Sequence, residues 1–151
     1  MDREAMLEAI ETLYEGRRTG DTSLFEKVLA PHASFRFVGD GSIIMEFPGG
    51  RDSDPQKVAQ ALLEQVDMLE RTMLSATIEE NRAAIHWRAV MRVKGGVPFQ
   101  HELFDLWEFN DDGLITAGHQ FQDTAKIIEE LDDAGKASSS GGSMGFDLGA
   151  S

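Results

Sequence analysis

An aspartate in the stretch FQHELFDLWEFNDDG, residues 99–113, is the first residue of this sequence that needs a chemical explanation. If the stretch begins with a β-strand, alternate side chains point to the same face, and Asp105 shares its face with large apolar groups. Such a carboxylate must be paired, hydrogen-bonded or protonated, because an isolated charge is costly in a low-dielectric interior. Asp105 is therefore the first candidate for a functional residue.

A histidine lies on the same predicted face. His101 is four positions before Asp105, about 13 Å along an extended strand, so the two side chains cannot share a direct hydrogen bond. They can instead hold opposite ends of a small ligand, one as acid and one as base, since histidine titrates near neutrality. The alternative is that Asp105 caps a buried backbone or tyrosine group, while His101 lies in water near a pocket rim.

The composition excludes several classes of partner. Lys and Arg total 14 against 27 Asp and Glu, and the net charge of -13 opposes binding to nucleic acid or to anionic lipid. No cysteine occurs, and the other histidines, His32, His86 and His119, show no ligand spacing, so we predict no metal and no cofactor. No signal peptide or transmembrane run is recognisable, which makes the cytoplasm the expected location.

The first part of the chain has the patterns of helices and a hairpin. Apolar residues at helical spacing predict a first helix that ends at Gly20 and a short second helix over residues 22–30. Two extended runs, 33–38 and 42–47, flank a Gly-Asp-Gly turn and predict a hairpin.

A long helix and then a run of strands are expected next. Asp54 has the properties of an N-cap, and an apolar stripe that includes Val66 and Leu69 predicts a helix over residues 53–70. From Arg71 onward the apolar period changes to two. This period predicts four strands, at about residues 72–79, 83–93, 98–109 and 114–123.

The end of the chain changes in composition. A final short helix is expected over residues 125–133. The segment that follows is rich in Gly and Ser and has too little apolar content to order itself. We therefore expect one domain over residues 1–133 and a flexible tail over residues 134–151.

Over residues 3–125, this order of elements resembles the nuclear transport factor 2-like superfamily. The stretch FDLWEFNDDGLI is similar to a pattern in its ketosteroid isomerase and SnoaL-like cyclase branch, and NRAAIHWRAVMRVKGG is similar to the strand before it. The resemblance implies an α+β fold, in which a cone-shaped, strongly curved, mixed but mostly antiparallel sheet packs on three N-terminal helices and encloses an apolar pocket. Proteins of this superfamily often form dimers.

The resemblance also assigns individual residues. Asp105 falls where ketosteroid isomerases have the protonated aspartic acid of their oxyanion hole, and Phe37 falls where they have the general-base aspartate. Their oxyanion-hole tyrosine falls nearest Leu13, which leaves Tyr14 displaced by about 100° around the helix. The acid–base aspartate of limonene epoxide hydrolases corresponds to Gln120, which can hydrogen-bond but not titrate.

These observations lead to two functional hypotheses. In the first, a SnoaL-like or ketosteroid isomerase-like enzyme binds a small, mostly apolar carbonyl compound and catalyses proton transfer in an isomerisation or cyclisation, with Asp105 as acid or oxyanion donor and His101 as base. In the second, the chain is a non-catalytic ligand-binding or dimerisation module. The expected pocket residues are Tyr14, Phe35, Phe37, Trp87, Met91, Leu103, Trp107, Gln120 and Gln122.

Two orientations on the sheet remain to be decided. Hydrophobicity does not determine which face of strand 114–123 points inward, although the resemblance favours an inward Gln120. Phe104 and Leu106 fall on the face opposite to Asp105 and would form an apolar strip on the outer side of the sheet. We expect a homodimer through this outer face.

Overall fold

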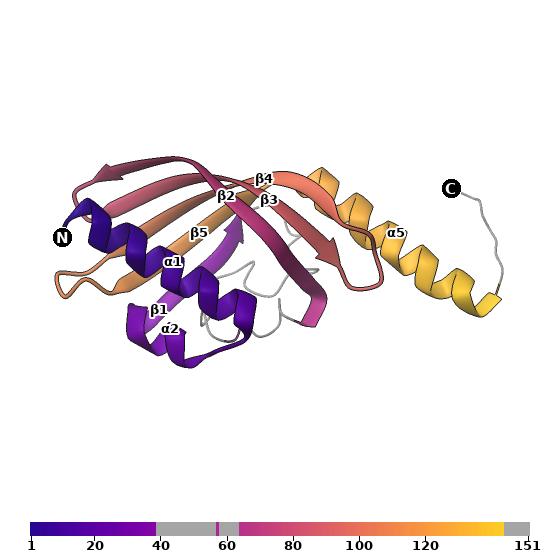
Figure 1. Cartoon of the computed structure of the whole chain (residues 1–151), viewed down its shortest axis with the longest axis horizontal. Helices are drawn as coiled ribbons and strands as arrows, with labels where there is room; N and C mark the ends of the chain where they lie inside the picture. The colour runs from indigo at the N-terminus through magenta and orange to yellow at the C-terminus, as the bar shows by residue number, and fades with distance from the viewer. Residues whose placement is uncertain (39–56, 58–63, 144–151) are drawn as a thin grey trace.

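The computed structural model describes residues 1–38, 57 and 64–143. These residues contain one mixed five-stranded sheet in the order β1-β5-β4-β3-β2 (Figure 1). Only β1 and β5 pair in parallel among the described strands, and the other neighbours are antiparallel. The strands are β1 (Leu29–Val38), β2 (Val66–Glu79), β3 (Arg82–Val93), β4 (Phe99–Phe109) and β5 (Ile115–Gln122).

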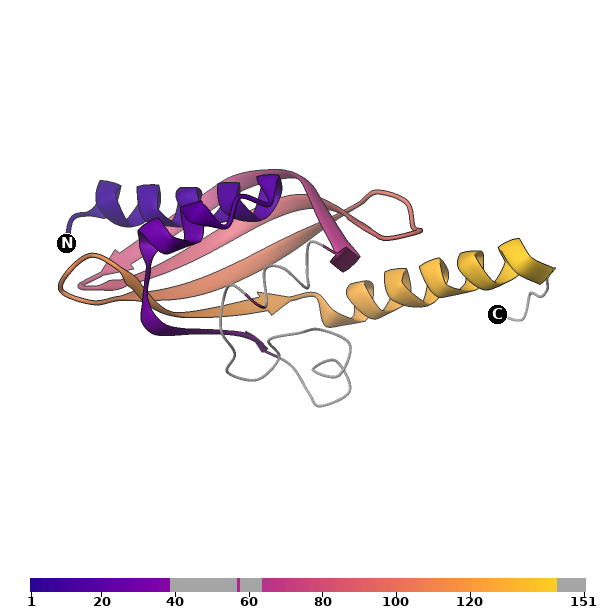
Figure 2. The same ribbon diagram turned by 90° about the horizontal axis from the view of Figure 1, so that it is seen from below.

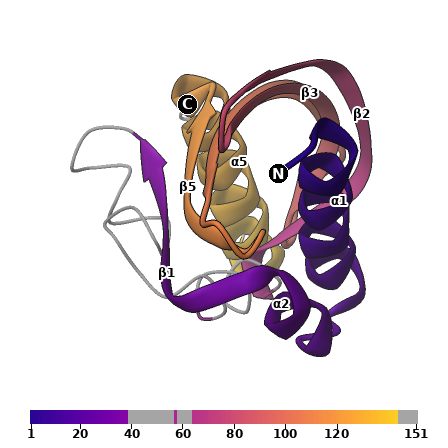
Figure 3. The same ribbon diagram turned by 90° about the vertical axis from the view of Figure 1, so that its left-hand side faces the viewer.

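Helices flank a strongly curved sheet, and the expected α+β class is confirmed. Figure 3 shows the sheet arching over α1 (Arg3–Thr19), which lies on its concave side. The short helix α2 (Ser23–Val28) leads into β1, and α5 (Thr124–Ser143) extends away from the far end of the sheet (Figure 2). The core lies between α1 and the concave face of the sheet.

Helix α1 has the apolar face that its sequence predicts. The side chain of Asp2 caps its first turn by accepting from the backbone N–H of Ala5 at 2.8 Å. Gly20 ends it in the left-handed conformation with φ 76°, which glycine adopts without steric cost. Met6, Ile10 and Tyr14 are buried against the sheet, because residues three or four apart lie on one side of a helix.

The strand faces are also as predicted. Buried and less buried residues alternate along the whole of β4, so Asp105 points into the core. In β3 every second residue from Ala83 to Val93 is buried as well. The open question on β5 is answered by Gly118 and Gln120, which are buried while Phe121 is exposed.

The boundary between the long helix and the sheet was predicted wrongly. Residues 64 and 65 are helical, but Val66 begins β2, and Val66 and Leu69 therefore belong to a strand. Val66 pairs with Val93 of β3, so tertiary pairing overrides the helical spacing of the local sequence. Most of the predicted helix, and the predicted turn and second strand of the 33–47 hairpin, lie outside the described residues.

The last helix is longer than predicted. Helix α5 continues to Ser143, so residues 134–143, expected in the flexible tail, are helical instead. Ala134 is buried, and its Cβ would lie 3.6 Å from a Cβ built on Gly96 in the turn before β4. Burial of Ala134 beside this turn supports the helix beyond residue 133. Residues 144–151 lie outside the described part of the chain.

The packing of β4 against β5 leaves no room for a side chain at Gly118. A Cβ placed on Gly118 would lie 2.3 Å from Cζ3 of Trp107 and 3.0 Å from Cδ2 of Phe35. Trp107 is opposite Gly118 in the pairing of β4 with β5. The absence of a side chain at residue 118 therefore leaves the space that the Trp107 indole occupies.

Gly118→Ala should therefore displace this indole and strain the core. We expect the free energy of unfolding, measured by urea denaturation, to fall by about 1 to 3 kcal/mol. Gly135→Ala in α5 is the matched control, since no atom lies within 4 Å of its built Cβ and alanine favours helix by about 0.5 to 1 kcal/mol. Equal effects of the two substitutions would contradict the steric explanation.

Candidate active site

The structure brings four hydrogen-bond donors to the fully buried carboxylate of Asp105. Its Oδ2 atom accepts from the Tyr14 hydroxyl, from Trp87 Nε1 at 2.9 Å and from Trp107 Nε1 at 3.3 Å. Its Oδ1 atom accepts from Gln120 Nε2 at 2.9 Å. The same amide nitrogen donates to the Tyr14 oxygen at 3.0 Å. We call these five residues the Asp105 cluster.

Helix and strand register bring the cluster together. Asp105 is directly opposite Gln120 on β5 and Ile85 on β3. Trp107 lies two residues after Asp105, and Trp87 lies two residues after Ile85, so both tryptophans point to the same inner face of the sheet. Tyr14 arrives from α1, with its ring centroid 5.2 Å from that of Trp87. The cluster therefore joins four elements of the fold.

Burial and hydrogen bonding act in opposite directions on Asp105. Burial raises the pKa of this carboxyl group above its ordinary value, and the donors, Tyr14 first among them, lower it in part. Burial likewise raises the pKa of Tyr14 well above its ordinary value, and the negative charge of Asp105 adds to this rise. Tyr14 therefore keeps its proton at neutral pH and can donate it in a hydrogen bond.

Two arginines that sequence reasoning missed lie close to the cluster. The Arg71 guanidinium lies 5.1 Å from the centre of the Tyr14 ring and 5.5 Å from that of Trp87, and it pairs with Glu11. Arg17 is buried one helical turn after Tyr14. The positive charges of Arg17 and Arg71 lower the pKa of Tyr14 in part. Continuing the apolar stripe of α1 by three residues would have indicated Arg17.

Two further polar side chains lie beyond the cluster, Gln122 on β5 and His101 on β4. Gln120 Oε1 accepts from Gln122 Nε2 at 2.9 Å. The remaining amide oxygen of Gln122 is buried and, within the described residues, has no hydrogen-bond partner. The same is true of both ring nitrogens of His101, whose ring packs edge-on against Phe99 with centroids 5.5 Å apart.

The predicted pocket residues lie on the inner side of the fold, in or beside the core. The Tyr14 hydroxyl donates to Asp105 directly, so a hydroxyl of α1 reaches the carboxylate. The apolar residues expected to face inward are buried: Phe35, Phe37, Trp87, Met91, Leu103 and Trp107. An apolar pocket enclosed by them stays a prediction.

The outer face of the sheet carries an exposed aromatic pair. Phe104 of β4 and Phe121 of β5 are directly opposite in register. Each is 42% exposed, and their ring centroids lie 6.2 Å apart. Leu106 on the same face is half-buried. The homodimer through this face also stays a prediction.

Across residues 1–38, 57 and 64–143, no three His, Cys, Asp or Glu side chains gather so that they could hold a metal ion. No helix in that part of the chain is long and apolar enough to cross a membrane.

Comparisons with solved structures define the class of the fold. The chain has the nuclear transport factor 2-like fold. A candidate isomerase from Rhodopseudomonas palustris superposes with a TM-score of 0.73 at 17% identity, covering 88% of this chain and 99% of that one. No family model and no curated protein matches the sequence.

Two further structures are similar to this chain. One is IdmH, a candidate polyketide cyclase from Streptomyces antibioticus, with a TM-score of 0.63 at 21% identity over 84% of this chain and 98% of that one. The other is an LEH-like epoxide hydrolase from M. tuberculosis, with a TM-score of 0.63 at 13% identity over 87% and 92%. At these identities the likeness concerns the fold alone.

Asp105→Leu removes the acceptor of four buried donors. We expect the free energy of unfolding in urea to fall by at least about 3 kcal/mol, since each unpaired buried donor costs about 1 to 3 kcal/mol. Asp112→Leu in an exposed turn is the control and should change stability by less than about 0.5 kcal/mol. An Asp105→Leu protein as stable as the parent would mean that the carboxylate is kept at a cost to the fold.

Proposed function

We propose that this protein binds a small, mostly apolar carbonyl compound on the concave face of the sheet and catalyses proton transfer, in the manner of SnoaL-like cyclases and ketosteroid isomerases. The observation that carries the proposal is His101. It is 6% exposed, and neither ring nitrogen has a hydrogen-bond partner among the described residues. Buried polar groups are nearly always paired, and an unpaired one is costly. A ligand group would supply the missing partner.

The environment of His101 suits a general base. Burial lowers its pKa below the ordinary value of 6.5, so the imidazole is neutral at pH 7 and one ring nitrogen carries a lone pair. In an enolisable ketone this nitrogen would take the α-proton, and the electrons of the C–H bond would form the enolate. Return of the proton to another carbon gives the isomer and restores the neutral imidazole.

The polar groups beyond His101 suit the oxygen of such a ligand. Gln122 is opposite Leu103 and so lies midway between His101 and Asp105 along the strand. Its free Oε1 can accept a hydrogen bond from a hydroxyl or enol group. At the far end, a protonated Asp105 would donate to a carbonyl oxygen. Burial raises the pKa of Asp105 in the direction that this role needs, while the hydrogen bonds of its four donors lower it in part.

One observation favours a second candidate function, ligand binding without turnover. All four donors to Asp105 come from the protein itself, so the cluster is complete before any ligand arrives. In this alternative Asp105 belongs to the fold, and His101 with Gln122 only orients the ligand. The two candidates differ in whether a proton of the ligand exchanges with solvent.

An exchange experiment in D₂O distinguishes the two candidate functions. NMR follows the replacement of ketone α-protons by deuterium in 1-indanone and 2-tetralone. We expect the parent to accelerate exchange and His101→Gln to slow it by at least about 100-fold, the smallest usual contribution of a general base. His86→Gln is the matched control, because His86 pairs with Glu102 at 2.6 Å and is far more exposed than His101, and it should exchange as the parent does. Ketone binding without accelerated exchange would favour the second candidate, and neither binding nor exchange would reject both.

The same exchange reaction should depend on pH in a defined direction. The base acts only when neutral, so the rate rises with pH through the pKa of His101 and then levels off. Burial lowers this pKa most, Asp123 raises it in part and Lys126 lowers it further. The half-maximal rate should therefore fall below pH 6.5. A midpoint above pH 6.5 would identify a different base.

A further inference from the structure

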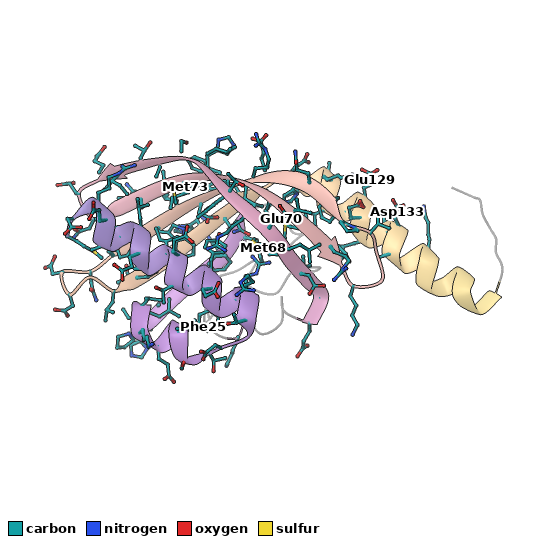
Figure 4. The ribbon with its side chains drawn as sticks, in the orientation of Figure 1. Phe25, Met68, Glu70, Met73, Glu129 and Asp133 are labelled. Atoms are coloured by element: carbon teal, nitrogen blue, oxygen red, sulfur yellow. The ribbon has the colours of Figure 1, made fainter. Side chains whose placement is uncertain are left out.

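A cavity separate from the His101 and Gln122 group opens where the last turn of α1 meets the beginning of β2. Its volume is about 320 Å³, close to the lower limit of about 300 Å³ for small-molecule sites. Figure 4 shows Met68 on the part of β2 that passes the end of α1. The cavity is lined by Arg17, Arg18, Val66, Asp67, Met68, Leu69 and Arg92.

The lining is positively charged in a protein of net charge -13. Two of its three arginines already have acidic partners in solvent. Arg18 pairs with Glu15 at 2.6 Å, and Arg92 pairs with Asp67 at 3.0 Å. Arg17 differs from both, since it is only 7% exposed and forms no ion pair or side-chain hydrogen bond within the part of the chain that the structure describes.

Arg17 has little exposure to solvent, and a guanidinium in such a place is costly to leave unpaired, because it loses most of its hydration without gaining a partner. Arg17 lies on the inner side of α1 because it continues the stripe that contains Tyr14. Asp105 attracts it only through space. The carbonyl end of the helix adds a partial negative charge, which is weaker than a full anion. A carboxylate in the cavity would give Arg17 the direct partner that the protein does not.

The other wall of the cavity is apolar. Val66 is buried, Met68 is half-buried, and Leu69 is 40% exposed. We propose that this cavity binds a small carboxylic acid with a short apolar chain, its carboxylate on Arg17 and its chain against Met68 and Leu69. A phosphate dianion fits less well, because one free guanidinium beside an apolar wall offers it few donors.

NMR titration with hexanoate and with its neutral analogue hexanamide tests this proposal. The parent should bind hexanoate more tightly than hexanamide. Arg17→Met should weaken hexanoate binding by about 10- to 100-fold, the usual effect of losing a hydrogen bond to a charged group, and leave hexanamide unchanged. Arg18→Met is the matched control in the same lining, and its effect should stay below about fivefold, because Arg18 is already paired in solvent.

Three results would each overturn the proposal. These are no hexanoate binding up to about 50 mM, equal affinity for hexanoate and hexanamide, and unchanged hexanoate affinity in Arg17→Met. If Arg17→Met does not fold, the comparison of the two ligands is made on the parent and on Arg17→Lys, which keeps the charge. Hexanoate is not a ketone, so its binding should be unchanged in His101→Gln. The test of this cavity is therefore independent of the test of the proposed reaction.

Discussion

The burial of one carboxylate is the constraint on which the rest of this structure depends. Asp105 has no contact with water, so the fold must supply its hydrogen bonds. The donors come from α1, β3, β4 and β5. Without the carboxylate, the Tyr14 hydroxyl and the indole N–H groups of Trp87 and Trp107 would be left unpaired in the core. The position of α1 on the sheet and the register of three strands are thus linked through one side chain.

Alternation along the strands made the sheet predictable from sequence. Apolar residues at every second position indicate which face of a strand is buried, and burial alternates in this way along the whole of β3 and β4. The same pattern failed at residues 66–70, where apolar spacing fits a helix as well as the start of β2. Local sequence does not contain the pairing partner of Val66, and that partner decided the outcome.

The candidate site was predictable to the extent that it rests on strand parity. Asp105 and His101 follow from that rule alone, whereas the hydrogen bond from Tyr14 to Asp105 depends on how α1 packs on the sheet, which the local sequence does not determine. Arg71 could not be anticipated. The register of β2 shifts between Met68 and Glu70 and again between Met73 and Ser75, and each irregularity reverses the rule that assigns side chains to faces.

The parallel pairing of β1 with β5 has a consequence for how the chain folds. Strands β2 to β5 are consecutive antiparallel neighbours and can form as local hairpins, whereas β1 must find the last strand of the sheet. Tyr14 and Asp105 are likewise 91 residues apart. Closing such long loops is entropically costly and slows folding. β1 therefore cannot pair until β5, much later in the chain, has formed, and the carboxylate gains the Tyr14 hydroxyl only when α1 docks.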